Sequence, residues 1–81
     1  MKIRFELFGV LQRLAGGDAI DVILSRSVTI ADALEELGAH RPELRGALTR
    51  CAVAIDDAIV MRRDPLPAGT TLALLPPVAG G

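Results

Sequence analysis

The chain has 81 residues and a formal net charge of −1, and 51% of its residues are hydrophobic. This length predicts one small domain, and the near-neutral charge without a basic stripe argues against a nucleic-acid partner. The N-terminus begins with strand-like residues and no apolar run is long enough for a membrane-spanning helix, so we expect a soluble cytoplasmic protein without membrane contact.

The N-terminal part of the chain predicts two strands joined by a short helix. Polar and apolar residues alternate over residues 2–8, which is the period of a half-buried strand. Residues 10–15 have the apolar spacing of a short helix that Gly16 and Gly17 would close, and residues 18–24 predict a second strand. The side chains expected to face the core are those of Ile3, Phe5, Leu7, Ile20, Val22 and Leu24.

The middle of the chain predicts the main helix. Thr29 at the N-cap and Asp32 three residues later resemble a capping box. Apolar residues then recur at helical spacing and form one stripe, and Gly38 predicts the end of the helix, with His40 just beyond it. Residues 42–48 predict a second, shorter helical segment. The inward-facing residues of both segments are expected to be Ile30, Ala33, Leu34, Leu37, Leu44, Ala47 and Leu48.

Three further strands are expected in the C-terminal half. They lie at residues 51–55, 58–61 and 70–75, separated by a turn at Asp56 and Asp57 and by a loop at residues 65–69. An order of two strands, one main helix and three strands requires the helix to pack across one face of a mixed sheet. The sequence therefore predicts an α+β domain of the β-grasp, or ubiquitin-like, class over residues 1–75, followed by a tail of residues 76–81.

The tail combines two prolines with two terminal glycines. Proline has no N–H and a fixed φ, so Pro76 and Pro77 are expected to end the last strand and direct the tail outward. Gly80 and Gly81 leave the terminal carboxylate unhindered, as a tail needs if a partner enzyme activates its end. The alternative is a frayed terminus without a role. In either case we expect residues 78–81 to be flexible in the isolated domain.

The strand order, the length and the ending Pro76-Pro77-Val78-Ala79-Gly80-Gly81 resemble the small subunit of molybdopterin synthase, a ubiquitin-like sulfur carrier of the MoaD/ThiS superfamily. The resemblance covers the whole chain, and the ending is its most specific part. It implies that the carboxylate of Gly81 is adenylated, converted to a thiocarboxylate and used to donate sulfur to cyclic pyranopterin monophosphate, which forms the dithiolene of molybdopterin. Gly80 is implied to keep the approach to that carboxylate open.

The same resemblance implies the partners. The large synthase subunit would hold the catalytic acid–base groups, in a heterotetramer of two small and two large subunits. An E1-like adenylating enzyme would consume ATP, and a sulfurtransferase or persulfide would donate the sulfur, while this chain binds no cofactor or metal itself. The alternatives are a carrier for thiazole or cysteine biosynthesis, a ubiquitin-like protein modifier, or an interaction module without chemistry.

A patch for partner binding is expected at the base of the tail. Strand periodicity places Phe8 and Leu75 on the outer face of the sheet, away from the core. The first and last strands of a β-grasp sheet are parallel neighbours, so the two side chains would form an exposed apolar patch, the usual mark of a partner surface. The predicted partner-binding residues are Phe8, Leu75, Pro76, Pro77, Val78 and Ala79.

Other reactive side chains have simpler interpretations. Cys51 is expected to be a buried structural residue, although a persulfide acceptor is the alternative. His40 is the only histidine and is expected on the surface near a helix end. Arg62, Arg63 and Asp64 are expected to form a solvated turn, and two aspartates at residues 56 and 57 are too few for a calcium loop.

Overall fold

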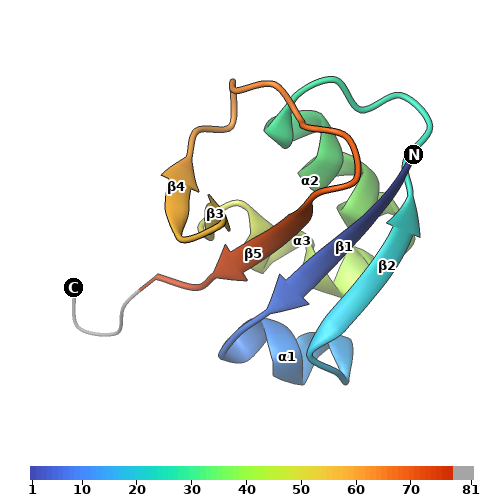
Figure 1. Cartoon of the computed structure of the whole chain (residues 1–81). Coiled ribbons are helices and arrows are strands. Elements are labelled where there is room, and N and C mark those ends of the chain that lie inside the picture. The colour runs from blue at the N-terminus through green and yellow to red at the C-terminus, as the bar shows by residue number, and fades with distance from the viewer. Residues whose placement is uncertain (78–81) are drawn as a thin grey trace.

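The structure is a computed structural model that describes residues 1–77, and its five strands form one mixed sheet (Figure 1). The strands follow the order β2-β1-β5-β3-β4 across the sheet. Their bounds are β1 Lys2–Leu7, β2 Ala19–Ile23, β3 Ala52–Ile55, β4 Ala58–Val60 and β5 Thr71–Leu75. The β1 and β5 strands are parallel at the centre of the sheet, and the remaining neighbours are antiparallel. Each strand lies within one residue of its predicted bounds, and the predicted β-grasp class is confirmed.

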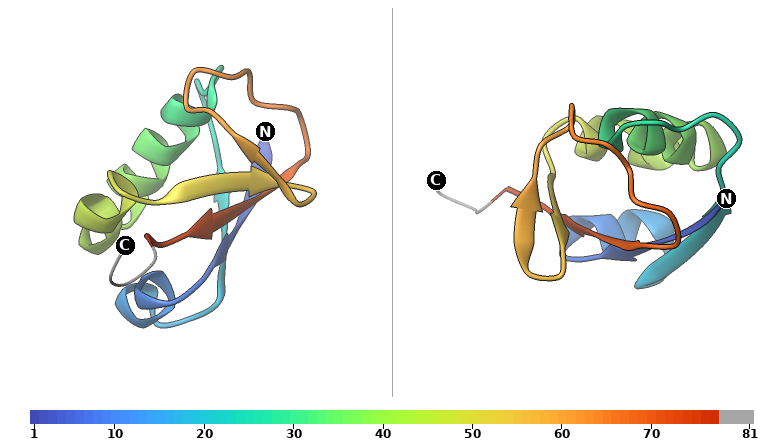
Figure 2. Two further views of the ribbon diagram at one scale, coloured as in Figure 1. Left: turned by 90° about the vertical axis from the view of Figure 1, so that its left-hand side faces the viewer. Right: turned by 45° about the horizontal axis from the view of Figure 1, so that its top comes forward.

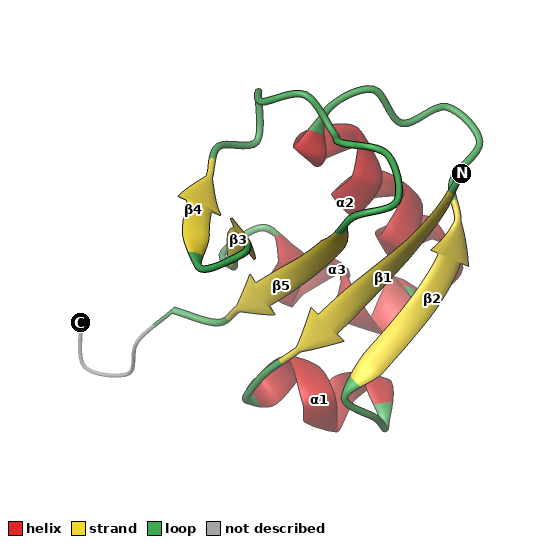
Figure 3. Ribbon diagram, viewed as in Figure 1, coloured by secondary structure: helices red, strands yellow, loops and turns green. Residues whose placement is uncertain are grey.

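The helices cover one face of this sheet and one of its ends. Their bounds are α1 Val10–Ala15, α2 Ile30–His40, η1 Pro42–Leu44 and α3 Arg45–Leu48, where η1 is a 3-10 turn. The longest helix, α2, and the shorter α3 lie on the same face, whereas the opposite face carries no helix within residues 1–77 (Figures 2 and 3). The sheet therefore has one face toward the core and one open face.

The predicted capping box starts α2. The Thr29 hydroxyl accepts a hydrogen bond from the backbone N–H of Asp32 at 3.2 Å, and the Asp32 carboxylate accepts one from the N–H of Thr29 at 3.0 Å. These reciprocal bonds satisfy backbone donors that the first turn of a helix leaves free.

The predicted end of this helix at Gly38 is wrong. Gly38 is buried inside α2, and a Cβ built on it would lie 3.1 Å from the Cγ of Arg45. Its lack of a side chain thus admits the Arg45 side chain rather than ending the helix. The helix continues to His40, its last residue, because Pro42 is the first residue that disfavours continuation.

The core lies between the sheet and the helices, and the predicted inward-facing residues occupy it. Complete burial of a large apolar side chain contributes about 1.5–3 kcal/mol relative to exposure. Ile20 and Ala47 are partly buried against the core, and no polar or charged residue is buried within the described part of the chain. The buried hydrophobic residues include Ile3, Phe5, Leu7, Val22, Leu24, Ile30, Ala33, Leu34, Leu37, Leu44, Leu48, Leu72 and Leu74.

The β3–β4 hairpin has the predicted turn at Asp56 and Asp57. Both residues have positive φ, 49° and 67°, as a two-residue type I′ turn requires. This turn places β4 beside β3 at one edge of the sheet. No helix within residues 1–77 has the length and apolar content needed to cross a membrane.

Candidate functional site

The C-terminal segment leaves the domain at the edge where β1 and β5 both finish (Figure 1). The parallel register pairs Leu7 with Leu74. Continuing this register by one residue places Phe8 beside Leu75. The base of the tail is therefore positioned by β1 and β5, two strands that each pair with a neighbour on both sides.

Phe8 and Leu75 line the same shallow hollow of about 540 Å³ on the open face of the sheet, which we call the outer-face hollow. Phe8 is 41% exposed, and Ile59 on β4 is 63% exposed. The lining consists of an apolar group and several polar residues: Phe8, Ala54, Ile59, Ala73 and Leu75, with Glu6, Asp56, Asp57 and Thr71. The predicted apolar patch thus extends well beyond Phe8 and Leu75.

The strand registers explain how this hollow forms. Glu6 pairs with Ala73, Ala73 with Ala54, and Ala54 with Ile59, so one row of residues crosses four strands. Two alanines in the middle of the row leave space between larger side chains at its ends. Strand periodicity places Ala54 and Ile59 on the same open face, but their position beside Phe8 depends on the strand order, which the sequence pattern did not predict.

The two prolines at the base of the tail lie against the helices. Pro76 and Pro77 line a second hollow of about 330 Å³ together with Val10 and Leu14 of α1. The remaining lining residues are Glu43, Gly46, Ala47 and Arg50. Figure 2 shows the end of β5 close to both α1 and α3. The base of the tail therefore separates the outer-face hollow from a helix-lined hollow, which we call the helix-side hollow.

Cys51 is buried, as predicted. Its side chain is 6% exposed, and its Sγ donates a hydrogen bond to the carbonyl of Leu48 at 3.4 Å. Burial raises the pKa of the Cys51 thiol, even though the guanidinium of Arg62 lies close to it and acts in the opposite direction. A protonated, buried thiol is a poor nucleophile, which agrees with a structural role.

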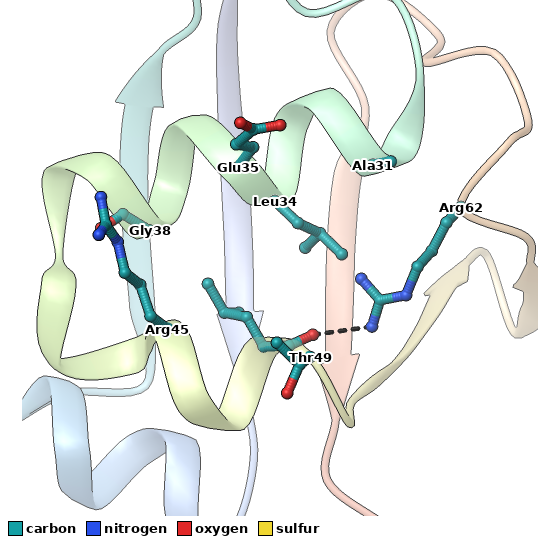
Figure 4. A pocket seen from close by; sticks show the side chains of 8 residues that line it. Ala31, Leu34, Glu35, Gly38, Arg45, Thr49 and Arg62 are labelled. Carbon is teal, nitrogen blue, oxygen red and sulfur yellow. Dashed lines mark hydrogen bonds between the residues drawn. The ribbon is translucent and has the colours of Figure 1, made fainter.

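Residues 62–64 form the predicted turn, but the Arg62 side chain is half-buried rather than solvated. Its Nη2 donates to the carbonyl oxygens of Leu48 at 2.7 Å and Cys51 at 2.9 Å, where the α3 segment ends. Figure 4 shows Arg62 reaching this point across a hollow of about 400 Å³ between α2 and α3. A cation that caps the last carbonyls of a helix is favourable, and no local pattern around residue 62 indicates it.

Neither His40 nor the aspartate turn forms a reactive cluster. His40 is exposed at the last position of α2. Within residues 1–77, no group of three or more His, Cys, Asp or Glu side chains is arranged to hold a metal ion. The predicted chemical residues Gly80 and Gly81, the partner-binding residues Val78 and Ala79, and the expected flexibility of the tail lie outside the described residues.

Comparisons with solved structures agree on the fold. The small archaeal modifier protein 1 from Haloferax volcanii is 29% identical, with 100% of both chains covered and a TM-score of 0.81. Subunit 1 in the complex of subunits 1 and 2 of the molybdopterin-converting factor from Helicobacter pylori is 24% identical, again with 100% of both chains covered, at a TM-score of 0.67.

A third similar structure is the BexX/CysO complex from Amycolatopsis orientalis, at 20% identity, with 98% of this chain and 99% of that chain covered and a TM-score of 0.73. A search of curated protein sequences found no match. The ThiS family matches residues 5–81, which is nearly the whole chain. The sequence-based resemblance to the MoaD/ThiS superfamily is thereby confirmed, and the chain belongs to the ThiS family as a ubiquitin-like sulfur carrier of the ThiS/MoaD type.

Proposed function

We propose that this chain is the sulfur-carrying small subunit of a molybdopterin synthase. The observation that carries the proposal is the Pro-Pro-Val-Ala-Gly-Gly ending directly after the last strand of a β-grasp sheet. The outer-face hollow at the base of this ending supports the proposal, because a partner that receives the tail needs a fixed surface beside it. The similar fold of the Helicobacter pylori molybdopterin-converting factor subunit adds further support.

The proposed chemistry takes place at Gly81. A carboxylate is a poor electrophile, so an E1-like enzyme first forms an acyl-adenylate: the carboxylate oxygen attacks the α-phosphorus of ATP and pyrophosphate leaves. A sulfur nucleophile then displaces AMP and gives a C-terminal thiocarboxylate, with a thiol reductant required when the donor is a persulfide. Because the sulfur is tethered to the domain, it reaches its acceptor at high effective concentration and does not escape into solution.

The acceptor is proposed to be cyclic pyranopterin monophosphate in the active site of the large subunit. Each thiocarboxylate supplies one sulfur atom, so two successive carriers complete a dithiolene. The acid–base groups would belong to the large subunit. The solved complex of subunits 1 and 2 from Helicobacter pylori supports a partner of this kind. For this chain, the proposed assembly is a heterotetramer of two small and two large subunits.

A second candidate is a ubiquitin-like protein modifier. The similarity to the small archaeal modifier protein 1, at 29% identity over the whole of both chains, favours it. A modifier would use the same activated Gly81 but transfer its acyl group to a lysine amine, forming an amide. The two functions therefore share the first chemical step and differ in the nucleophile that follows.

Intact-mass spectrometry after co-expression with the cognate adenylating enzyme separates these functions. The proposed function predicts that the chain gains the mass difference between sulfur and oxygen, and that the loaded chain yields dithiolene product when mixed with the large subunit and the pterin precursor. A ladder of larger conjugates without thiocarboxylate would identify a modifier. A chain lacking Gly81 is the control and should show neither product.

A further inference from the structure

Gly9 and Pro76 are in close contact at the base of the tail. A Cβ built on Gly9 would lie 2.8 Å from the Cγ of Pro76, and the Cβ and Cδ of that ring are both at 3.8 Å from the same point. Carbon atoms in ordinary contact are about 3.5–4.0 Å apart, so any side chain at residue 9 would have to displace the proline by about 1 Å. A proline ring cannot rotate out of the way as a flexible side chain can.

The backbone of Gly9 is also restricted to glycine. Its φ of 58° and ψ of −129° are the mirror image of the extended conformation that ordinary residues adopt. This conformation turns the chain from the end of β1 into α1, where the Gly9 carbonyl accepts a hydrogen bond from the N–H of Gln12 at 3.1 Å. Two independent features, the backbone angles and the contact with Pro76, therefore require glycine at residue 9.

The contact follows from the parallel register of the two central strands. Leu7 pairs with Leu74, and two residues further along each strand lie Gly9 and Pro76. Pro76 lacks an N–H and cannot continue the ladder, so its ring packs on the Gly9 backbone instead. The other side of the Pro76–Pro77 pair lines the helix-side hollow with Val10 and Leu14. Pro76, the first residue of the tail, is thus half-buried against the domain.

We infer that Gly9 is a positioning residue that aims the tail by seating Pro76. This inference rests on the proposed function of the tail and adds a part of the domain to it. A Pro-Pro segment is stiff and extended, so a shift or tilt of the Pro76 ring is transmitted along the chain. Four residues beyond Pro77 span at most about 14 Å, so the position of Pro77 limits where the terminal carboxylate can be delivered. Misplacement of a reacting group by 1 Å costs up to about 100-fold in rate.

The test compares Gly9→Ala with Gly16→Ala as a matched control. Gly16 also has positive φ, 76°, but a Cβ there would meet nothing within 4 Å. Both variants introduce backbone strain, and only Gly9→Ala disturbs Pro76. The measured quantities are the maximal rate of Gly81 adenylation by the cognate enzyme and the concentration of the full-length chain at half-maximal rate.

We expect Gly9→Ala to lower the maximal rate at least about tenfold relative to Gly16→Ala, with a similar half-saturating concentration. Equal maximal rates for the two folded variants would overturn the inference while leaving the proposed function intact. A wild-type chain that the enzyme does not adenylate would instead overturn the proposed function.

Pro76→Ala tests the same contact with Gly9 unchanged, including the case in which Gly9→Ala does not fold. It removes the Cγ that a new Cβ would strike, and we expect a lower maximal rate with an unchanged half-saturating concentration. An unchanged maximal rate, or a rise in the half-saturating concentration alone, would contradict a positioning role. If Gly9→Ala folds, the double variant should have the same maximal rate as Pro76→Ala alone, because the clash no longer exists. A double variant whose maximal rate falls by the product of the two single reductions would refute the contact.

Discussion

The carboxylate of Glu36 on α2 accepts a hydrogen bond from the hydroxyl of Ser27, in the loop that precedes the same helix. The backbone N–H groups of Ser25 at 3.0 Å and Arg26 at 3.1 Å also donate to this carboxylate. Together these donors, with the Ser27 hydroxyl the strongest, lower the pKa of Glu36 to about 2, against an ordinary value of 4.5. Glu36 thereby holds the connection between β2 and α2 in place.

This arrangement predicts a loss of stability in acid. The folded pKa of about 2 lies below the ordinary value of 4.5, so the contribution of Glu36 is fully present above pH 4.5 and is lost as the pH falls toward 2. Glu36→Gln should be less stable than the wild type at pH 7, and the difference should shrink across this pH range. Urea denaturation of both proteins at several pH values measures this difference in the free energy of unfolding. Glu35→Gln is the control, because Glu35 is an exposed neighbour on the same helix; an equal effect of both substitutions would contradict the prediction.

The tail is predicted to be essential for chemistry and dispensable for folding. Deletion of Gly81, or replacement of Gly80 by a bulky residue, should abolish thiocarboxylate formation, because the adenylating enzyme then meets a shortened or a hindered terminus. The free energy of unfolding should change by no more than about 0.5 kcal/mol, as for a residue outside the core. Mass spectrometry and thermal denaturation provide the two measurements.

The same experiment tests whether the domain takes a direct part in the chemistry. Cys51→Ser removes the one thiol of the chain and should retain sulfur loading, because the buried thiol is not expected to carry sulfur. A folded Cys51→Ser variant that no longer accepts sulfur would show that the tail does not act alone.

The outer-face hollow is predicted to bind the partners of this chain. Phe8→Asp introduces a charge into its apolar lining without disturbing the core, because the Phe8 side chain points away from Phe5 and is 41% exposed. Affinity for the large subunit or the adenylating enzyme should fall at least tenfold, about 1.4 kcal/mol. Ile59→Asp should act in the same direction from a different strand.

A matched control for these substitutions is Ile23→Asp. Ile23 is 73% exposed on β2 but does not line the hollow. Its replacement should leave both affinities unchanged, as measured by titration calorimetry. Equal losses of affinity for Phe8→Asp and Ile23→Asp would show that the docking face is elsewhere. The same conclusion would follow if neither Phe8→Asp nor Ile59→Asp lowered the affinity for either partner.

Glycine at residue 57 is predicted to stabilise the β3–β4 turn relative to the natural aspartate. Asp57 has a φ of 67°; left-handed backbone costs most residues about 1–2 kcal/mol and aspartate less, whereas glycine adopts it freely. After allowance for the greater freedom of glycine in the unfolded chain, Asp57→Gly should raise the free energy of unfolding by up to about 1 kcal/mol. Ala58→Gly, in the adjacent strand, should lower it by a similar amount. Chemical denaturation of both variants tests the prediction, which fails if Asp57→Gly is the less stable of the two.

Local sequence patterns determined the secondary structure of this protein. Alternation of polar and apolar residues locates β1, the Thr29–Asp32 capping box starts α2, and paired aspartates locate the hairpin turn, because each pattern acts between residues a few positions apart. The ending with Pro76, Pro77, Gly80 and Gly81 likewise indicates the family from the residues alone. These features depend on the identity and spacing of residues that lie close together in the chain, which can be read from the sequence.

Only the tertiary structure decided which side chains meet between these elements. Gly38 lies inside α2 and admits the Arg45 side chain, and the Arg62 guanidinium donates to carbonyls at the end of α3. The parallel β1–β5 pairing likewise brings Gly9 against Pro76 across most of the length of the chain. Such contacts depend on strand order and register, which arise from burial of the whole core and are not encoded in any short stretch of sequence.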